Sequence, residues 1–290
     1  MLICSGLPPP TPASTSSAAP TYLTQARLKR QPDIQLPGKE FYDLAVVSPD
    51  MLLVSNRSKQ CVQLLDCLKG KVMSELQLQN CPWRICLTDR NTAAVQVGDK
   101  KIQLIKVKDK TLTNGRELTV SEDIRGLTSC RNSLALVVSY ANGYVSGPWL
   151  EVISMYGGTV LHQFDKSGKS QHFKHPSFMC TTPGGSVFIS DWGTHTITKV
   201  DAQLNLLQTF TSPLLEDPRG ITAVTEDQIL VCSSRNDSLV LLQPSTNTMS
   251  TLLGKDDGIE DPLSLTYCPD QKKVYIASRY TDTFKVYQMS

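Results

Sequence analysis

The chain has 290 residues, a formal net charge of +2, 40% hydrophobic residues and 19% charged residues. These proportions are typical of a folded globular protein and exclude the disordered and coiled-coil classes. The charge is too small to indicate a nucleic-acid partner by itself, and no apolar run reaches the roughly 18 residues that a membrane-spanning helix needs.

Residues 1–28 are rich in Pro, Ser, Thr and Ala and contain few large apolar side chains. Such a segment cannot bury enough surface to offset the entropy lost on ordering, so we expect a flexible linker or tail. The first ten residues have no basic stretch, and three prolines at 8–10 interrupt the apolar run. We therefore expect no signal peptide. The nine cysteines are scattered without any CxxC pair, which favours reduced thiols and a cytoplasmic location.

From residue 29 onward, short apolar strings alternate with turn residues, and almost nothing falls at helical spacing. One kind of string recurs six times, as MLLVSN at Met51, TAAVQV at Thr92, SLALVVS at Ser133, SVFISD at Ser186, QILVCS at Gln228 and KVYIAS at Lys273. This pattern predicts an all-β fold built from repeats.

A four-residue start motif precedes each of these strings. The motifs begin at Phe41, Pro82, Ile124, Pro176, Pro218 and Pro262. The spacing is in the low forties except after the third motif, where about ten residues are inserted. A repeat of this length with several strands is typical of a propeller blade.

Each repeat contains an inner strand A at the start motif, the strand B given above, and then strands C and D. The sixth repeat ends at Ser290 before a strand D can form. Residues 33–36, which precede the first start motif, can supply this strand and leave no open sheet edge. We therefore predict a six-bladed β-propeller of four-stranded antiparallel blades at 29–290, closed by an N-terminal strand.

The sharpest repeat is the fourth, VFISDWGTHTITKVD at 187–201, and the fifth start motif reads PRGI at 218–221. Both resemble the NHL repeat, and the whole chain resembles the C-terminal propeller of tripartite-motif (TRIM) proteins. The resemblance implies recognition of a ubiquitination substrate or of RNA, without catalysis. At the position of Asp191 the other repeats have different residues, namely Asn56, Gly98, Ser139, Ser233 and Ser278.

In a propeller, the loops that join strand B to C and strand D to A lie on one face. This arrangement predicts a face with several arginines among aromatic side chains, which suits phosphate contact with base stacking, or an acidic protein segment. The predicted ligand-binding residues are Arg57, Trp83, Arg84, Arg125, Tyr140, Tyr144, Trp149, Trp192, Arg219, Arg235, Arg279 and Tyr280.

Structural roles compete with this interpretation. Arg219 can brace a blade junction, and arginines beside strands are often simply solvated. Asp191 can accept hydrogen bonds from its own loop, and no nucleophile is spaced to cooperate with His175 or His195. The longer loop at 140–149 is either a recognition loop or a segment that packs on its own blade.

Three functions remain to be compared. The first is a protein-interaction module, most plausibly the substrate-binding end of a tripartite-motif ubiquitin ligase. The second is RNA binding, with a steep dependence on salt. The third, a calcium-dependent lactonase, needs acidic side chains converging on the propeller axis, and the repeats contain no matched set. We expect no catalytic residues, cofactor, metal, membrane association or small-molecule substrate.

Overall fold

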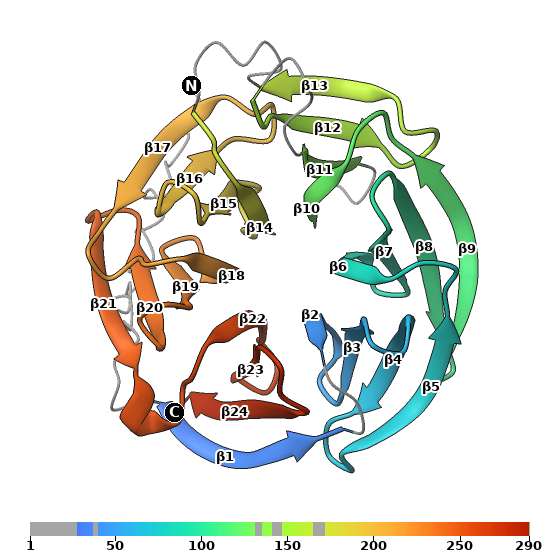
Figure 1. Ribbon diagram of the computed structural model, residues 1–290, viewed down its shortest axis with the longest axis horizontal. Helices are drawn as coiled ribbons and strands as arrows, with labels where there is room; N and C mark the ends of the chain where they lie inside the picture. Colours follow the sequence, from blue (N-terminus) through green and yellow to red (C-terminus); the bar gives the residue numbers. More distant parts are fainter. Residues whose placement is uncertain (1–27, 37–39, 131–134, 141–146, 165–171, 290) are drawn as a thin grey trace, which may run out of the picture.

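The computed structural model describes residues 28–36, 40–130, 135–140, 147–164 and 172–289. In these residues, 24 strands form six separate four-stranded antiparallel sheets. Figure 1 shows the sheets arranged as blades around a central axis, with the first strand of each blade innermost. The predicted all-β, six-bladed propeller is therefore confirmed.

Each blade runs outward in chain order from the axis, apart from the last blade, which borrows its outer strand. The first three blades comprise β2 (Phe41–Ser48), β3 (Met51–Asn56), β4 (Cys61–Asp66), β5 (Lys71–Gln77); β6 (Pro82–Asp89), β7 (Thr92–Val97), β8 (Lys101–Lys108), β9 (Thr111–Thr119); and β10 (Ile124–Ser129), β11 (Ala135–Tyr140), β12 (Leu150–Ser154), β13 (Val160–Phe164).

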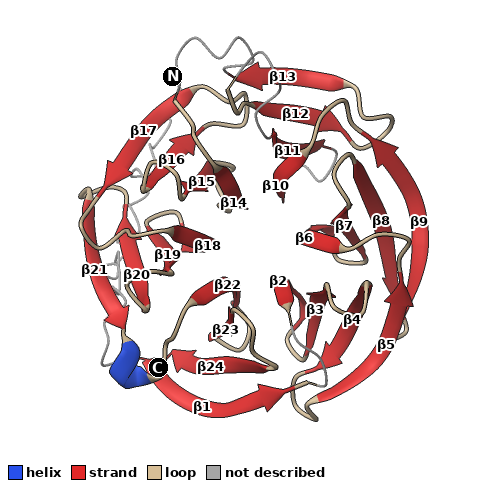
Figure 2. Cartoon of the chain, viewed as in Figure 1, coloured by secondary structure: helices blue, strands red, loops and turns tan. Residues whose placement is uncertain are grey.

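The other three blades follow the same order. They comprise β14 (Pro176–Thr181), β15 (Val187–Asp191), β16 (Thr196–Val200), β17 (Leu206–Thr211); β18 (Pro218–Thr225), β19 (Gln228–Ser233), β20 (Ser238–Gln243), β21 (Thr248–Leu253); and β22 (Pro262–Cys268), β23 (Lys273–Ser278), β24 (Thr283–Met289), β1 (Leu28–Gln35). Outside the strands, one short 3₁₀ turn at Lys255–Asp257 appears as the helical segment in Figure 2.

Burial follows the position of a strand within its blade. Strands β3 and β4 of the first blade are buried along their whole length, because both of their faces pack against neighbouring blades. The outer strand β5 instead alternates between exposed and half-buried positions. This difference explains why the middle strands are nearly continuous apolar strings in the sequence, whereas the outer strands are mixed.

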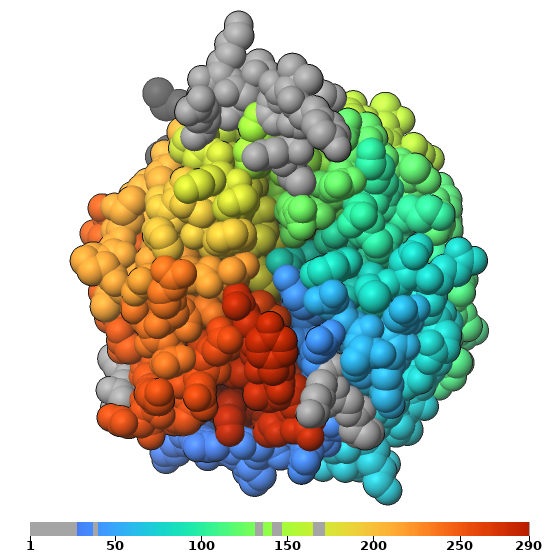
Figure 3. Space-filling model, viewed as in Figure 1, coloured from blue at the N-terminus to red at the C-terminus, as the bar shows by residue number. Residues whose placement is uncertain are grey.

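The ring closes between the two ends of the described chain. Strand β1 pairs antiparallel with β24, with Ile34 opposite Phe284, and the Leu36 amide donates to the Asp282 carbonyl at 2.8 Å. Figures 1 and 3 show β1 lying along the outer edge of the last blade. The predicted closure is confirmed, and the strand begins at Leu28, the last residue assigned to the predicted tail.

Side chains near the end of strand B tie each of the first four blades to the next one. The Oγ atoms of Ser55, Ser139 and Ser190 donate to carbonyls at the following start motif, at 3.0, 3.1 and 2.7 Å respectively. In the second blade Gln96 takes this role, and its Nε2 donates to the Ile124 carbonyl at 2.8 Å. These bonds fix the inner strands relative to one another around the axis.

Glycine at the third position of two start motifs allows adjacent blades to approach closely. A Cβ atom at Gly220 would lie 2.6 Å from the Ser264 Cα and 2.9 Å from the Leu265 amide nitrogen. Both are backbone atoms of β22, so the next blade itself would have to move. At Gly126 a Cβ would lie 2.7 Å from the Ser177 carbonyl oxygen.

We predict that Gly220→Ala lowers the free energy of unfolding by about 1–3 kcal/mol, because the added methyl group overpacks the contact between the fifth and sixth blades. Urea unfolding measures the change. Gly254→Ala is the matched control, since a Cβ there would have nothing within 4 Å. Equal stabilities of the two variants would contradict this account of the blade junction.

Among the described residues, no helix is long and apolar enough to cross a membrane.

Candidate functional site

A cavity of about 420 Å³ opens at the end of the central channel where the inner strands begin. The second residue of the start motif lines this cavity in five of the six blades, as Tyr42, Trp83, Arg125, Ser177 and Arg219. The propeller therefore brings five equivalent backbone positions together around one opening, and each position carries a different side chain. We call this cavity the channel mouth.

Three side chains from three blades close the channel below its mouth. The guanidinium carbon of Arg84 lies 3.3 Å from the ring centroid of Phe178 and 4.8 Å from that of Tyr42. The two rings are parallel within 8°, with centroids 6.4 Å apart. Their blades, the first and the fourth, stand opposite each other in the ring (Figure 1). We call Tyr42, Arg84 and Phe178 the channel plug.

Arg84 spans the neighbouring blade to reach this position. Its Nε donates to the carbonyls of Arg125 at 3.2 Å and Ser177 at 3.0 Å. A second cavity of about 380 Å³ lies beyond the plug, and Arg84 is the one residue that lines both cavities. The side chain is 4% exposed, so its charge is almost fully removed from water.

A buried carboxylate accompanies this buried cation. Asp43 accepts hydrogen bonds from the Ser264 Oγ at 2.6 Å and from the Ile85 amide at 2.9 Å, which joins the sixth, first and second blades. Burial raises the pKa of Asp43, and the positive charge of Arg84 opposes that shift. Burial likewise lowers the pKa of Arg84. The two groups thus reduce the cost of each other's burial.

Aromatic side chains form much of the wall of the channel mouth. Trp83 meets Tyr42 edge to face at 4.9 Å, and the Arg57 guanidinium lies 3.9 Å from the Trp83 ring centroid. In the third blade, Tyr140 stacks on Trp149 at 4.9 Å. Both residues of this pair are buried in the apolar cluster that joins the second and third blades. Residues 141–146, including Tyr144, lie outside the described residues.

The fourth blade contributes a second aromatic stack. Trp192 lies parallel to the His175 imidazole, with ring centroids 4.1 Å apart, and the Arg219 guanidinium lies 4.6 Å from the Trp192 ring centroid. The three side chains form one stack at the mouth, with the two rings side by side and the Arg219 cation against the indole. Such a stack presents a flat, rigid surface with little conformational entropy to lose on binding.

Asp191 holds the loop that carries this stack. Its side chain is fully buried and accepts hydrogen bonds from the amides of Lys174 at 2.6 Å, His175 at 2.8 Å, Gly193 at 2.9 Å and Thr194 at 3.2 Å. The predicted structural role of Asp191 within its own loop is confirmed. The structure adds that the same carboxylate also positions the loop that leads into β14.

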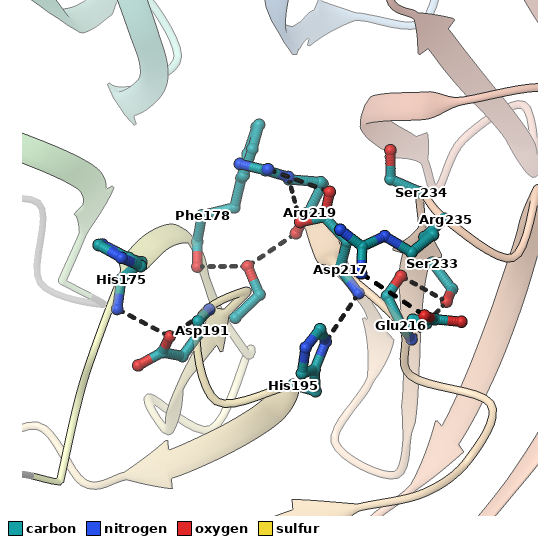
Figure 4. Close-up of polar contacts among 12 residues, drawn as sticks. His175, Phe178, Asp191, His195, Glu216, Asp217, Arg219, Ser233, Ser234 and Arg235 are labelled. Atoms are coloured by element: carbon teal, nitrogen blue, oxygen red, sulfur yellow. Dashed lines mark hydrogen bonds and ion pairs between the residues drawn. The ribbon is translucent and has the colours of Figure 1, made fainter.

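Three of the arginines predicted for the binding face form ion pairs, and Figure 4 shows those of Arg219 and Arg235. Arg219 forms a two-point contact with Asp217, at 2.8 Å from Nε to Oδ1 and 3.1 Å from Nη2 to Oδ2. Arg279 lies 3.6 Å from both Asp217 and Asp261, and Arg235 lies 3.6 Å from Glu216. The fifth and sixth blades therefore present a mixed charge network, not a strip of unpaired cations.

Two cationic side chains that form no ion pair among the described residues lie at the wall formed by the third and fourth blades. Neither Arg125 nor Lys174 makes an ion pair with any described residue, and both are exposed lining residues of the cavity. Burial lowers the pKa of His175 below its usual value of 6.5. Asp191 opposes this shift, while Lys174, Arg125 and Arg219 add to it.

The predicted site residues fall into three groups. Six line the channel mouth, namely Trp83, Arg84, Arg125, Tyr140, Trp192 and Arg219. Arg57 and Trp149 do not line the cavity but contact the lining residues Trp83 and Tyr140 respectively. Arg235, Arg279 and Tyr280 do not line the cavity, and Tyr280 is 76% exposed.

The prediction omitted Tyr42, Lys174 and Ser177, which also line the channel mouth. The second position of the start motif would have identified Tyr42 and Ser177, because it aligns them with Trp83. His175, which the sequence places in the loop between strands D and A, lines the mouth as well, and its neighbour Lys174 could have been identified from the same loop. Within the described ranges, no group of three or more His, Cys, Asp or Glu side chains is placed to hold a metal ion.

Comparison with known proteins gives the fold and no family. No family model matches the chain, and no curated protein matches it, so the resemblance to NHL and tripartite-motif proteins is not confirmed. Solved structures with the same fold include the Cps50 (Swd1) β-propeller domain of Myceliophteria thermophila. That domain is 11% identical, with a TM-score of 0.59 over 83% of this chain and 80% of the domain.

Two bacterial structures of unknown function are also similar. The protein from Bacteroides thetaiotaomicron is 12% identical, with a TM-score of 0.69 over 92% of this chain and 74% of that one. The protein from Desulfotomaculum acetoxidans is 12% identical, with a TM-score of 0.58 over 79% of this chain and 73% of that one. At these identities the likeness shows a β-propeller and nothing about function.

We predict that an NMR titration places the pKa of His175 below 6.5, and that Arg125→Gln raises this pKa because it removes one of the neighbouring positive charges. Arg90→Gln, an exposed arginine that does not line the mouth, is the control and leaves the value unchanged. Equal pKa values of His175 in the wild type and in Arg125→Gln would contradict a contribution of Arg125 to the potential at this wall.

Proposed function

We propose that the chain is a non-catalytic protein-binding module that holds a segment of its partner at the channel mouth. The observation that carries the proposal is the cavity of about 420 Å³ with tryptophan, tyrosine and arginine side chains in its wall. Its size is that of a pocket that encloses a small ligand or a few residues of a peptide. Tryptophan, tyrosine and arginine are also the residues that dominate the binding energy of protein interfaces.

The charge network of the fifth and sixth blades favours protein over RNA. A phosphate backbone is bound by cations that release counterions, and here Arg219, Arg235 and Arg279 are already paired with carboxylates. Asp99 and Asp123 also line the mouth and would repel phosphate groups. Alternating charges of this kind suit a protein surface, where complementary pairs set register and specificity.

The finer proposal is that the bound protein is a substrate for ubiquitination, as in tripartite-motif ligases. It is supported by the resemblance of residues 187–201 to an NHL repeat and by the place of Trp192, from that segment, at the channel mouth. The scattered cysteines favour a cytoplasmic partner. RNA binding is the alternative, and the Trp192–His175 stack is the feature that would receive a base.

We predict that Trp192→Ala weakens partner binding by roughly tenfold or more, as expected for loss of a central aromatic anchor. Proteins captured from a lysate by the immobilised chain would be identified by mass spectrometry, and the affinity of each would be measured with purified partner. Tyr280→Ala is the matched control, because Tyr280 is an exposed aromatic residue of another loop and does not line the mouth.

If the partner is a protein, we expect its capture from the lysate to persist after ribonuclease treatment. Partners that are retained equally by both variants would contradict binding at the channel mouth. Capture that disappears after ribonuclease treatment, together with an affinity for labelled RNA that falls steeply with salt, would establish the RNA alternative instead.

A further inference from the structure

The floor of the channel mouth contains buried polar atoms without a hydrogen-bond partner among the described residues. They are the Nη1 of Arg84, the Oγ of Ser177 and the Oε1 of Gln96, and all three residues line the cavity. Their side chains are nine-tenths or more buried, at 4%, 5% and 4% exposure respectively. Because buried polar groups in native proteins are almost always paired, these three atoms point to a group supplied by a ligand.

The chemistry of the three atoms specifies that group. Arg84 Nη1 and the Ser177 hydroxyl donate hydrogen bonds, and the guanidinium carries a full positive charge, so together they suit an anionic oxygen. Gln96 Oε1 is a carbonyl oxygen and can only accept a hydrogen bond. The donating Nε2 of the same amide is bound to the Ile124 carbonyl. A ligand that satisfies the set must therefore offer both a negatively charged acceptor and an N–H donor.

The charged side chains at the rim of the channel mouth also favour an anion at its floor. Arg125 and Lys174 are exposed at the mouth without a carboxylate partner among the described residues, and they come from the third blade and from the loop before the fourth. The His175 imidazole beside them is shifted toward its neutral form, partly by these two cations. The acidic residues Asp99 and Asp123 nevertheless line the same cavity, which suits a singly charged carboxylate better than a doubly charged phosphate.

We propose that the channel mouth binds the carboxylate of an Asp or Glu side chain within a peptide segment of the protein partner. This inference rests on the proposed protein-binding function. The carboxylate accepts hydrogen bonds from Arg84 and Ser177, and a backbone N–H of the same segment donates to Gln96. Trp83 and Trp192, which line the cavity, pack against the residues on either side of the acidic one.

The test uses two capped tetrapeptides that differ only in charge. Tetraglutamate and tetraglutamine, both acetylated and amidated, are titrated into the whole chain, and binding is followed by NMR at the tryptophan indoles. Three tryptophans are present, of which Trp83 and Trp192 line the cavity. We expect tetraglutamate to bind at least about tenfold more tightly than tetraglutamine, because a charged partner strengthens each hydrogen bond.

Ser177→Ala is the decisive variant, because the Ser177 hydroxyl forms no hydrogen bond to the described part of the chain whose loss would disturb the fold. We expect Ser177→Ala and Arg125→Gln each to weaken tetraglutamate binding by about fivefold to tenfold, while the thermal midpoint of Ser177→Ala stays at or above that of the wild type. Arg90→Gln removes an arginine outside the mouth and must leave binding unchanged.

Several results would overturn the proposal. They are equal affinity for the two tetrapeptides, binding that is insensitive to Ser177→Ala and Arg125→Gln, or binding confined to peptides with a free C-terminal carboxylate. Inorganic phosphate that displaces tetraglutamate at equal concentration would also overturn it. If Trp192→Ala abolishes partner capture while tetraglutamate does not bind, the protein-binding function stands and only the carboxylate inference fails.

Discussion

Pairing between β1 and β24 is the constraint on which the rest of the molecule depends. The two strands are separated by almost the whole chain, and their hydrogen bonds hold the sixth blade beside the first. The channel mouth is a property of the closed circle, because its lining comes from the inner ends of successive blades. If the circle opened, Tyr42 and Phe178 would no longer face each other across the axis, and the plug would be lost.

A regular backbone carries an irregular set of side chains. The third position of the start motif is Asp43, Arg84, Gly126, Phe178, Gly220 and Ser264 in successive blades. Glycine at 126 leaves room beside the Ser177 carbonyl that Arg84 reaches from the neighbouring blade. The repeat thus provides the scaffold, whereas its departures from regularity create the site.

The sequence predicted the blades well because each blade is marked by a short apolar string within its own repeat. Strand B of each blade is packed between neighbouring blades, so most of its residues are apolar and the same string recurs six times. All six A strands begin at the predicted start motifs, and each predicted B string coincides with a strand. The site is harder to predict. Six of the proposed lining residues do line the cavity, because the start motif fixes where they lie. The pairing of Arg219 with Asp217 is local, because the two residues are two positions apart. The pairing of Arg279 with Asp217 joins the sixth blade to the loop before the fifth, and no spacing in the sequence contains that information.

The channel plug also limits the path that a bound chain can take. With Tyr42, Arg84 and Phe178 filling the axis, the mouth is a cup with a floor and not a tunnel through the disc. A partner segment cannot thread from one face to the other, so it has to enter and leave by the same side. Segments that already bend sharply, such as hairpin tips and tight loops, meet this demand at the lowest entropic cost, whereas a long extended strand would have to fold back on itself.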